Sequence, residues 1–138
     1  MQKMRTDRDH YFMEIAKVVS TRSTCDRLFV GSVLVRDNRI IATGYNGAAS
    51  GQPQCDEVGH EMEDGHCVRT IHAEHNAVIQ CAYAGVSSKD SVIYITHMPC
   101  DRCQKLLINA GVKEVIYNED YTFDKAPLLP VRKLRTVS

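Results

Sequence analysis

A split set of metal-binding residues constrains this chain of 138 residues more than any other feature. The first part is His72-Ala73-Glu74, and the second is Pro99-Cys100-Asp101-Arg102-Cys103. His72, Cys100 and Cys103 supply an imidazole and two thiols, which is one ligand fewer than a closed tetrahedral zinc site has. Zinc held in this way keeps a fourth position open, as catalytic zinc does, so the fold has to bring two distant segments to one point.

The pattern of apolar residues predicts the elements that carry these segments. The chain offers Thr6 or Asp7 as the first N-cap, and Gly85 and Gly111 as helix stops. We expect three helices, over residues 7–20, 71–83 and 99–110. We expect four strands, over residues 29–35, 39–43, 91–96 and 112–117. The first two strands flank a short turn and form a hairpin, and crossovers join the later ones, so the order predicts a mixed sheet covered by helices.

Helix starts are where the predicted metal ligands fall. His72 and Glu74 lie in the first turn of the second helix, and Cys100 and Cys103 lie in the first turn of the third. Both helix N-termini then direct partial positive charge at the site, which favours thiolates. Zinc lowers the pKa of a bound water to about 7, and Glu74 is placed to move its protons. The pattern H-x-E…P-C-x-x-C is the signature of zinc deaminases that act on nucleobases.

The composition argues against some classes of partner. The formal net charge is zero, whereas proteins that bind nucleic-acid polymers usually carry a basic surface. No apolar run approaches the length of a transmembrane helix, and residues 1–8 show no apolar leader. We therefore expect a cytoplasmic protein without membrane contact. In that compartment its six cysteines are more often metal ligands than disulfides.

Five stretches of the chain resemble the cytidine and deoxycytidylate deaminase superfamily, and within it the bacterial and phage branch of the deoxycytidylate (dCMP) deaminase family. They are residues 23–27, 42–47, 66–74, 99–103 and 117–121. The zinc-binding stretches are shared across the superfamily and indicate only the type of reaction. Residues 23–27 and 42–47 indicate dCMP as the substrate. The resemblance covers residues 8–123. It implies a single zinc-dependent deaminase domain over residues 1–138, a three-layer α/β/α sandwich with a five-stranded mixed sheet, and a homo-oligomer, usually a hexamer.

The resemblance also implies the reaction and its residues. In this family dCMP is hydrolysed to dUMP and ammonia, a step in pyrimidine deoxynucleotide metabolism that supplies dTMP. The catalytic zinc is held by His72, Cys100 and Cys103, and Glu74 shuttles protons. The expected substrate contacts are Arg27, Asn46, Ala73 and Tyr121. An arginine guanidinium can donate two parallel hydrogen bonds to a phosphate group, so it is well suited to bind one.

Regulation by nucleotides is a further implication of the resemblance. Many members of the family are activated by dCTP and inhibited by dTTP, with Mg²⁺ accompanying the triphosphate. Backbone N–H groups in a glycine-rich turn can cradle phosphate. The loop that matches the effector region contains the expected allosteric residues Tyr45, Gly47, Ser50 and Gly51.

The polar, glycine-rich stretch of residues 44–68 is long enough to need something that ties it down. The resemblance implies a second, structural zinc near it, and three cysteines with one histidine suit a closed tetrahedral site. The residues left for this site are Cys25, Cys55, His66 and Cys67. His60 stays open as a replacement, because adjacent ligands such as His66 and Cys67 are less usual. The alternative is reduced, buried cysteines with no ion.

Two other functions remain open at this point. One is another deaminase of the superfamily, acting on free cytidine or deoxycytidine or on a purine base. A free-cytidine enzyme would not need Arg27 or the Gly-Tyr-Asn-Gly loop that ends at Gly47. The other is a non-catalytic zinc-binding module, against which Glu74 argues because a structural zinc site does not require it.

Overall fold

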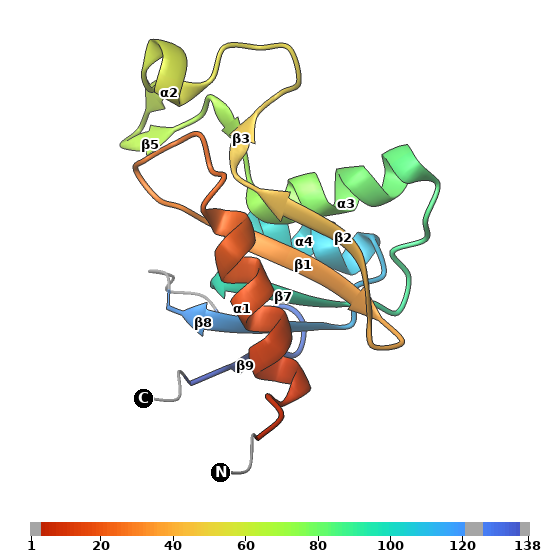
Figure 1. Cartoon of the computed structure of the whole chain (residues 1–138). Helices are drawn as coiled ribbons and strands as arrows, with labels where there is room; N and C mark the ends of the chain where they lie inside the picture. The colour runs from red at the N-terminus through yellow and green to blue at the C-terminus, as the bar shows by residue number, and fades with distance from the viewer. Residues whose placement is uncertain (1–3, 121–125, 136–138) are drawn as a thin grey trace.

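A five-stranded mixed sheet forms the centre of the molecule (Figure 1). The computed structural model describes residues 4–120 and 126–135 of the chain. In their order across the sheet, the strands are β2 (Arg39–Tyr45), β1 (Gly31–Arg36), β7 (Val92–His97), β8 (Glu114–Glu119) and β9 (Val131–Lys133). β1 runs antiparallel to β2 and β7, whereas β8 is parallel to both β7 and β9. The predicted hairpin and the predicted crossover are confirmed.

Helices cover both faces of this sheet, which makes three layers (Figure 1). α1 (Arg8–Ser20) packs on one face against β1 and β7, and α3 (Ala73–Ala84) packs on the other against β1 and β2. α4 (Asp101–Asn109) lies beside α3. Successive side chains of a strand point to opposite faces, so Val33 joins the cluster under α1 and Leu34 joins the cluster under α3. The expected α/β/α sandwich is confirmed.

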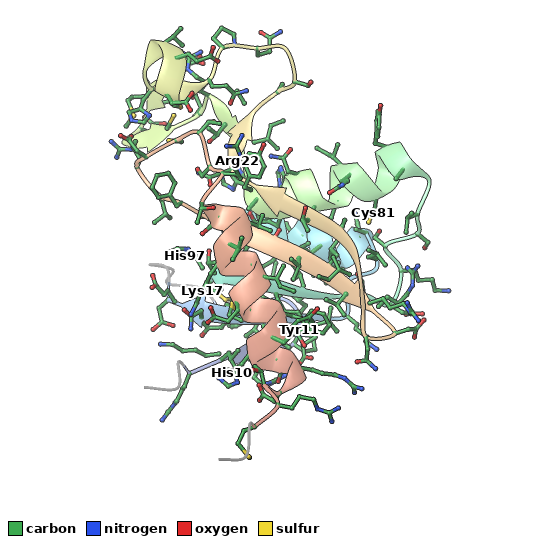
Figure 2. The ribbon with its side chains drawn as sticks, in the orientation of Figure 1. His10, Tyr11, Lys17, Arg22, Cys81 and His97 are labelled. Carbon is green, nitrogen blue, oxygen red and sulfur yellow. The ribbon has the colours of Figure 1, made fainter. Side chains whose placement is uncertain are left out.

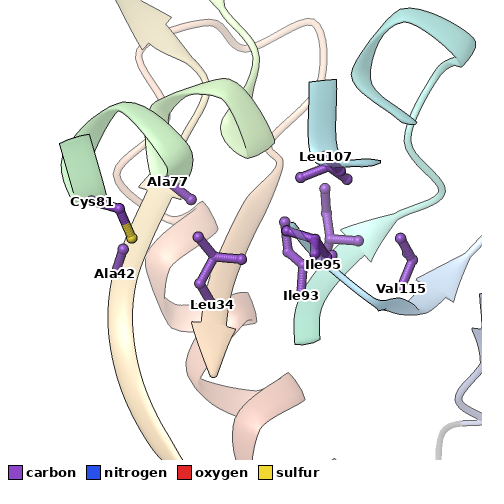
Figure 3. Close-up of a cluster of buried hydrophobic side chains, with 9 residues drawn as sticks. Leu34, Ala42, Ala77, Cys81, Ile93, Ile95, Leu107 and Val115 are labelled. Atoms are coloured by element: carbon purple, nitrogen blue, oxygen red, sulfur yellow. The ribbon is translucent and has the colours of Figure 1, made fainter. Parts of the chain in front are cut away.

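The apolar cluster between the sheet and the helices α3 and α4 holds those two helices in place (Figure 3). Leu34, Ile93 and Ile95 from the strands meet Ala77 of α3 and Leu107 of α4, and all five are fully buried. Burial of one Leu or Ile side chain contributes about 1.5–3 kcal/mol. The positions of both helices are therefore set by the core.

α3 packs tightly against β2 at Gly44. A Cβ atom there would lie 2.2 Å from the Ala73 carbonyl oxygen and 2.5 Å from the Ala77 nitrogen, so no larger residue fits. Buried Ser32 donates from Oγ to the same Ala73 carbonyl at 3.1 Å. These contacts tie the start of α3 to β1 and β2. Cys81, farther along α3, lies in the same core (Figures 2 and 3).

The long stretch before α3 contains several small elements. They are β3 (Gly47–Ala48), α2 (Cys55–Val58), β4 (Met62–Glu63), β5 (His66–Cys67) and β6 (Thr70–Ile71). β3 pairs with β6, and β4 pairs with β5, in each case antiparallel. α2 and β5 project together beyond the main sheet, at the top of Figure 1. Sequence patterning missed these elements because two-residue strands have no measurable period.

The C-terminal segment supplies the fifth strand of the sheet. β9 pairs in parallel with β8, and the Val115 N–H donates to the carbonyl of Pro130, just before β9. Pro127 and Pro130 exclude a long helix in this segment, and its sequence has no pattern that predicts a strand. Three residues are too few to show alternation, so the fifth strand followed from the family resemblance alone.

The predicted chain reversals and helix ends have the expected geometry. Asp7 is the N-cap of α1, and its carboxylate accepts a hydrogen bond from the His10 N–H at 3.0 Å. Gly85 ends α3 in the left-handed conformation. Asp37 and Asn38 both have positive φ, as a type I′ hairpin turn requires. Among the described residues, no helix is long and apolar enough to cross a membrane.

Candidate metal centres

Two helix starts carry the first cluster, which comprises His72, Cys100 and Cys103. His72 is the N-cap of α3, Cys100 is the N-cap of α4, and Cys103 is the third residue of α4. Their donor atoms all lie within 4.8 Å of one another. His72 Nδ1 is 3.1 Å from the Cys103 sulfur, and the two sulfurs are 3.3 Å apart. The structure thus brings together the three residues that the sequence placed on separate helices.

The two thiols of the first cluster cannot both ionise easily without a cation. Hydrogen bonding from Cys103, helped by His72, lowers the pKa of Cys100 to about 4. The pKa of Cys103 is raised, because its thiol is hydrogen-bonded to Cys100 and because it is buried. A dication would stabilise both thiolates at once, and two thiolates with an imidazole are ligands that zinc accepts. The residues fit a zinc ion with one coordination position left for a small molecule.

Glu74, the second residue of α3, lies beside the first cluster. Its side chain is almost fully buried, at 4% exposure, and it is hydrogen-bonded with Cys103. Burial raises the pKa of Glu74 to about 7, although a backbone hydrogen bond and the charge of His72 act in the opposite direction. A carboxyl group with a pKa near 7 can both accept and donate a proton at neutral pH. A purely structural metal site has no use for such a group.

A second cluster lies among the small elements before α3 and comprises Cys25, Cys55, His60 and Cys67. Its four donor atoms also lie within 4.8 Å of one another. The Cys25 sulfur is 3.4 Å from His60 Nδ1, and the sulfurs of Cys55 and Cys67 are 3.5 Å apart. Burial raises the pKa of Cys55 to about 12, whereas backbone hydrogen bonds outweigh burial at Cys67 and lower its pKa to about 6. Three sulfurs and one imidazole fit a closed tetrahedral zinc site.

Among the described side chains, the histidine of the second cluster is His60, the alternative that the sequence left open. The side chain of His66, named first from the sequence, lies outside the described part of the structure. His60 Nε2 is 2.9 Å from Asp26 Oδ1, which leaves Nδ1 to face the sulfurs. A carboxylate on the far nitrogen of a metal-binding histidine fixes its tautomer and ring orientation. The sequence predicted no role for Asp26. Its position next to Cys25 was the only sequence feature that pointed to a role in this cluster.

Asn46, one of the expected substrate contacts, is a buried clamp. Its side chain has 8% exposure. Oδ1 accepts from the Val30 N–H at 2.9 Å, and Nδ2 donates to the Leu28 carbonyl at 2.7 Å. Asn46 therefore fixes the loop that leads from α1 into β1.

The other expected contacts lie in different surroundings. Arg27 is exposed and donates from Nη2 to the Gly65 carbonyl at 3.3 Å. Ala73 is buried at the start of α3. Tyr121 lies outside the described residues. The expected effector residues follow one another from the end of β2 through β3 into an exposed turn: Tyr45, Gly47, Ser50 and Gly51.

Two polar side chains near the start of α4 had no role in the sequence-based predictions. Buried Gln104 donates from Nε2 to the Pro99 carbonyl at 3.0 Å and accepts from the Leu128 N–H at 2.9 Å, so it holds the turn before α4. His97, at the end of β7 (Figure 2), pairs through Nε2 with Glu119 at 3.0 Å. Single polar residues of this kind have no spacing pattern, so only the folded chain reveals their partners.

The sequence matches known proteins along most of its length. Residues 6–119 match the family model of the cytidine and deoxycytidylate deaminase zinc-binding region. The chain is 50% identical to ComE operon protein 2 of Bacillus subtilis (strain 168) over 113 residues, which cover 82% of this chain and 60% of that protein. It is 36% identical to the deoxycytidylate deaminase of Schizosaccharomyces pombe over 133 residues, which cover 88% of this chain and 40% of that protein. The chain thus spans between 40% and 60% of the length of these two relatives.

A solved structure matches the fold over its whole length. It is the dCMP deaminase from the cyanophage S-TIM5 in complex with dCMP and dUMP. The two chains superpose with a TM-score of 0.82 at 31% identity, covering 96% of this chain and 100% of the cyanophage chain. The similarity therefore includes the sheet, its helices and the segments that carry both clusters.

Proposed function

This chain belongs to the cytidine and deoxycytidylate deaminase family, and on that premise we propose that it hydrolyses dCMP to dUMP and ammonia. The observation that carries the proposal is the first cluster with the buried Glu74 carboxyl beside it. Three protein ligands leave one position open, and the adjacent carboxyl supplies the acid and base that hydrolysis needs. The dCMP and dUMP bound by the cyanophage enzyme support the choice of nucleotide.

Glu74 makes the proton transfers in the proposed reaction. A zinc ion held by His72, Cys100 and Cys103 would supply Lewis acidity and lower the pKa of a water to about 7. The Glu74 carboxylate accepts a proton from the water that attacks C4 of the cytosine ring, and it delivers that proton to N3. It then transfers the remaining hydroxyl proton to the amino group, which leaves C4 as ammonia. Burial of the Glu74 side chain disfavours its charged form, which suits a group that must both accept and donate a proton.

Nucleotide binding is proposed for Arg27, Asn46, Ala73 and Tyr121. The Arg27 guanidinium suits the 5′-phosphate, because its parallel N–H groups match phosphate oxygens. An amide side chain has two N–H donors and two acceptor lone pairs. The hydrogen bonds to Val30 and Leu28 use one acceptor lone pair and one N–H donor of the Asn46 side chain. The remaining donor and lone pair suit the sugar and the base of the nucleotide.

The second cluster is proposed to hold a structural zinc ion. Its four donors lie within 4.8 Å of one another and suit a closed tetrahedral site, and Asp26 contacts the far nitrogen of the His60 ring. Such an ion would join Cys55 of α2 and Cys67 of β5 to Cys25 and His60, which lie in loops. Its binding free energy would therefore act as folding free energy for this part of the chain.

Regulation and assembly extend the proposal on the strength of family membership. We expect activation by dCTP with Mg²⁺ and inhibition by dTTP through the loop that contains Tyr45 and Gly51. We also expect one domain over residues 1–138, a hexamer, a cytoplasmic location and a role in dTMP supply. A velocity curve that stays hyperbolic in dCMP and ignores both triphosphates would remove the regulatory part.

The decisive experiment compares dCMP, deoxycytidine and dCTP at equal concentrations, with release of ammonia and of the uracil product as readouts. We expect turnover of dCMP alone. Arg27→Ala should then raise the KM for dCMP about 10-fold or more, because a charged hydrogen bond to phosphate is lost. Turnover of deoxycytidine but not dCMP would keep the chemistry and overturn the phosphate assignment. If none reacts, even with an effector present, the proposed substrate is wrong, and purine bases become the next candidates.

A further inference from the structure

We propose that Gln54 is a positioning residue that ties the second cluster to the segment carrying Asn46, and thereby sets the affinity for the nucleotide. The inference rests on the function proposed above, because it takes dCMP as the ligand and Asn46 as one of its contacts. Gln54 acts through other residues and has no assigned contact with the nucleotide. Its role follows from hydrogen bonds that join elements far apart in the sequence.

The Gln54 side chain holds two backbone segments together. Its Oε1 accepts from the Thr24 hydroxyl at 2.7 Å and from the Ala48 N–H at 2.8 Å. Its Nε2 donates to the Ala48 carbonyl over a longer distance of 3.5 Å. Thr24 directly precedes Cys25, and Gln54 directly precedes Cys55. One half-buried amide thus lies beside two ligands of the second cluster and holds β3.

Ser23 adds a second link between the same two regions. Its hydroxyl donates to the Asn46 carbonyl at 3.1 Å, and the Thr24 N–H donates to that carbonyl at 3.3 Å. Ser23 Oγ also accepts from the Cys25 N–H at 3.3 Å. The backbone of Asn46 is therefore held by the residues just before a ligand of the second cluster.

The segment of residues 45–48 is joined to the first cluster as well. β3 pairs with β6, whose last residue, Ile71, directly precedes His72. Asn76, in the first turn of α3, donates from Nδ2 to the Tyr45 carbonyl at 2.7 Å. Residues next to both clusters therefore contact this short segment, which includes the buried side chain of Asn46.

The two anchors of this segment differ in strength. On the side of the first cluster, α3 is packed on β2 at Gly44, so the position of Glu74 does not depend on residues 45–48. On the side of the second cluster, the Gln54 amide holds β3 at Ala48, and the Ser23 hydroxyl holds the Asn46 carbonyl. Loss of that amide leaves the Ala48 N–H without its acceptor and loosens β3. The effect should therefore appear in nucleotide binding rather than in proton transfer.

The test is Gln54→Leu, which approximately keeps the side-chain volume and removes both polar atoms. We expect the KM for dCMP to rise about tenfold, with kcat within about twofold of the parent enzyme. Zinc content should stay at one ion per cluster, which separates positioning from loss of an ion. Without nucleotide, amide hydrogen exchange in a peptide covering residues 45–48 should become about tenfold faster.

Three further variants show whether the polar contacts matter. Gln54→Glu keeps an oxygen that can accept from Thr24 and Ala48, so its KM should return to within about threefold of the parent. Thr24→Val removes one donor at nearly constant shape and should raise the KM by a smaller factor. Gln52 is exposed in the same loop, so Gln52→Leu should leave the KM and the exchange rates unchanged.

Several outcomes would overturn the proposal. If Gln54→Leu has the KM and the amide exchange rates of the parent, the Gln54 amide does not position residues 45–48 for nucleotide binding. A fall in kcat at constant KM places the effect at Glu74 or the first cluster, and loss of an ion makes Gln54 part of the metal site. If the parent enzyme leaves dCMP unchanged, the proposed function fails. The exchange measurement then decides alone whether Gln54 holds residues 45–48.

Discussion

The two clusters use the same residue types, and they differ in ligand number and in the place of the nearest carboxyl group. The first has three donors, with the carboxyl of Glu74 buried beside them. The second has four donors, and its carboxylate contact is Asp26, which is 81% exposed and lies behind His60. An open position with a buried acid suits chemistry, whereas a closed set with an exposed carboxylate suits structure. The two clusters therefore differ more in their surroundings than in their ligand types.

The scaffolds of the two clusters differ as well. The first lies at the starts of α3 and α4, which are held by fully buried side chains such as Ala77 and Leu107. The second joins a single helical turn and a two-residue strand, in a region where Val58, Met62 and Val68 are exposed. We therefore expect the first site to keep its shape without an ion, and the second region to depend on one.

Glu74→Gln should give the largest effect and test the chemical half of the comparison. The amide cannot accept the water proton, so kcat/KM for dCMP should fall about 10³-fold. Zinc content should not change, because Glu74 is not among the ligands. Steady-state ammonia release and metal analysis check both points, with Glu14→Gln on α1 as the control. If Glu74→Gln loses zinc, Glu74 is a fourth ligand of the first site. The two sites would then no longer differ in ligand number.

Cys55→Ala and Cys103→Ala separate stability from activity. Cys55→Ala should lose the ion of the second cluster and lower the Tm by about 10 °C, because the ion supplies folding free energy there. Cys103→Ala should abolish turnover but lower the Tm by only about 4 °C, since the core holds α4. Metal analysis, thermal denaturation and activity give the answer. Equal losses of Tm would contradict the proposed difference between the scaffolds.

Asp26→Asn should weaken the second site without emptying it. Loss of the carboxylate behind His60 should lower the zinc affinity of that site about 10- to 100-fold, because the tautomer and the ring orientation are no longer fixed. Competition with a chelator of known affinity measures this, and the affinity of the first site should be unchanged. Asp56→Asn, at an exposed position next to Cys55, is the matched control. An equal effect of both variants would mean that general charge, rather than the contact with His60, is responsible.

Asp9→Asn should give the smallest effect, on the acid sensitivity of a region that carries neither cluster. Burial alone would raise the pKa of Asp9, but hydrogen bonds from Tyr94 and Arg132 outweigh it and hold the pKa below its usual value. Such a group stabilises the fold above its unfolded-state pKa of about 3.9, and this contribution is lost as the pH falls through the lower folded value. The Asp9 side chain is 29% exposed and that of Arg132 is 47% exposed, so solvent screening limits the contribution to at most about 1 kcal/mol.

The measurement is the Tm of the Asp9→Asn variant minus that of the parent, between about pH 6 and about pH 2. The variant should be less stable than the parent at the upper end, and the gap should close as the pH falls. Both proteins lose metal in acid, so this loss cancels in the difference between the two Tm values. The acid sensitivity that remains in the variant includes the contribution of the two clusters. A gap that widens in acid would contradict the direction of the pKa shift.

The fold was predictable from the sequence wherever periodicity extends over enough residues. The hairpin of β1 and β2, the crossover into β8 and the helix ends at Asp7 and Gly85 are confirmed. The pattern missed β9 and the small elements between residues 47 and 71. Two or three residues cannot show alternation, and tertiary pairing alone makes them strands.

The sequence by itself determined which residues of the first cluster have metal-binding chemistry, because His72 with Glu74, and Cys100 with Cys103, are each local patterns at a helix start. Only the tertiary structure decided that His60 meets Cys25 across 35 residues, with Asp26 behind it. It also decided that Gln54 joins β3 to the second cluster. Local spacing is set by backbone geometry that any helix shares, whereas contacts between distant segments depend on the path of the whole chain.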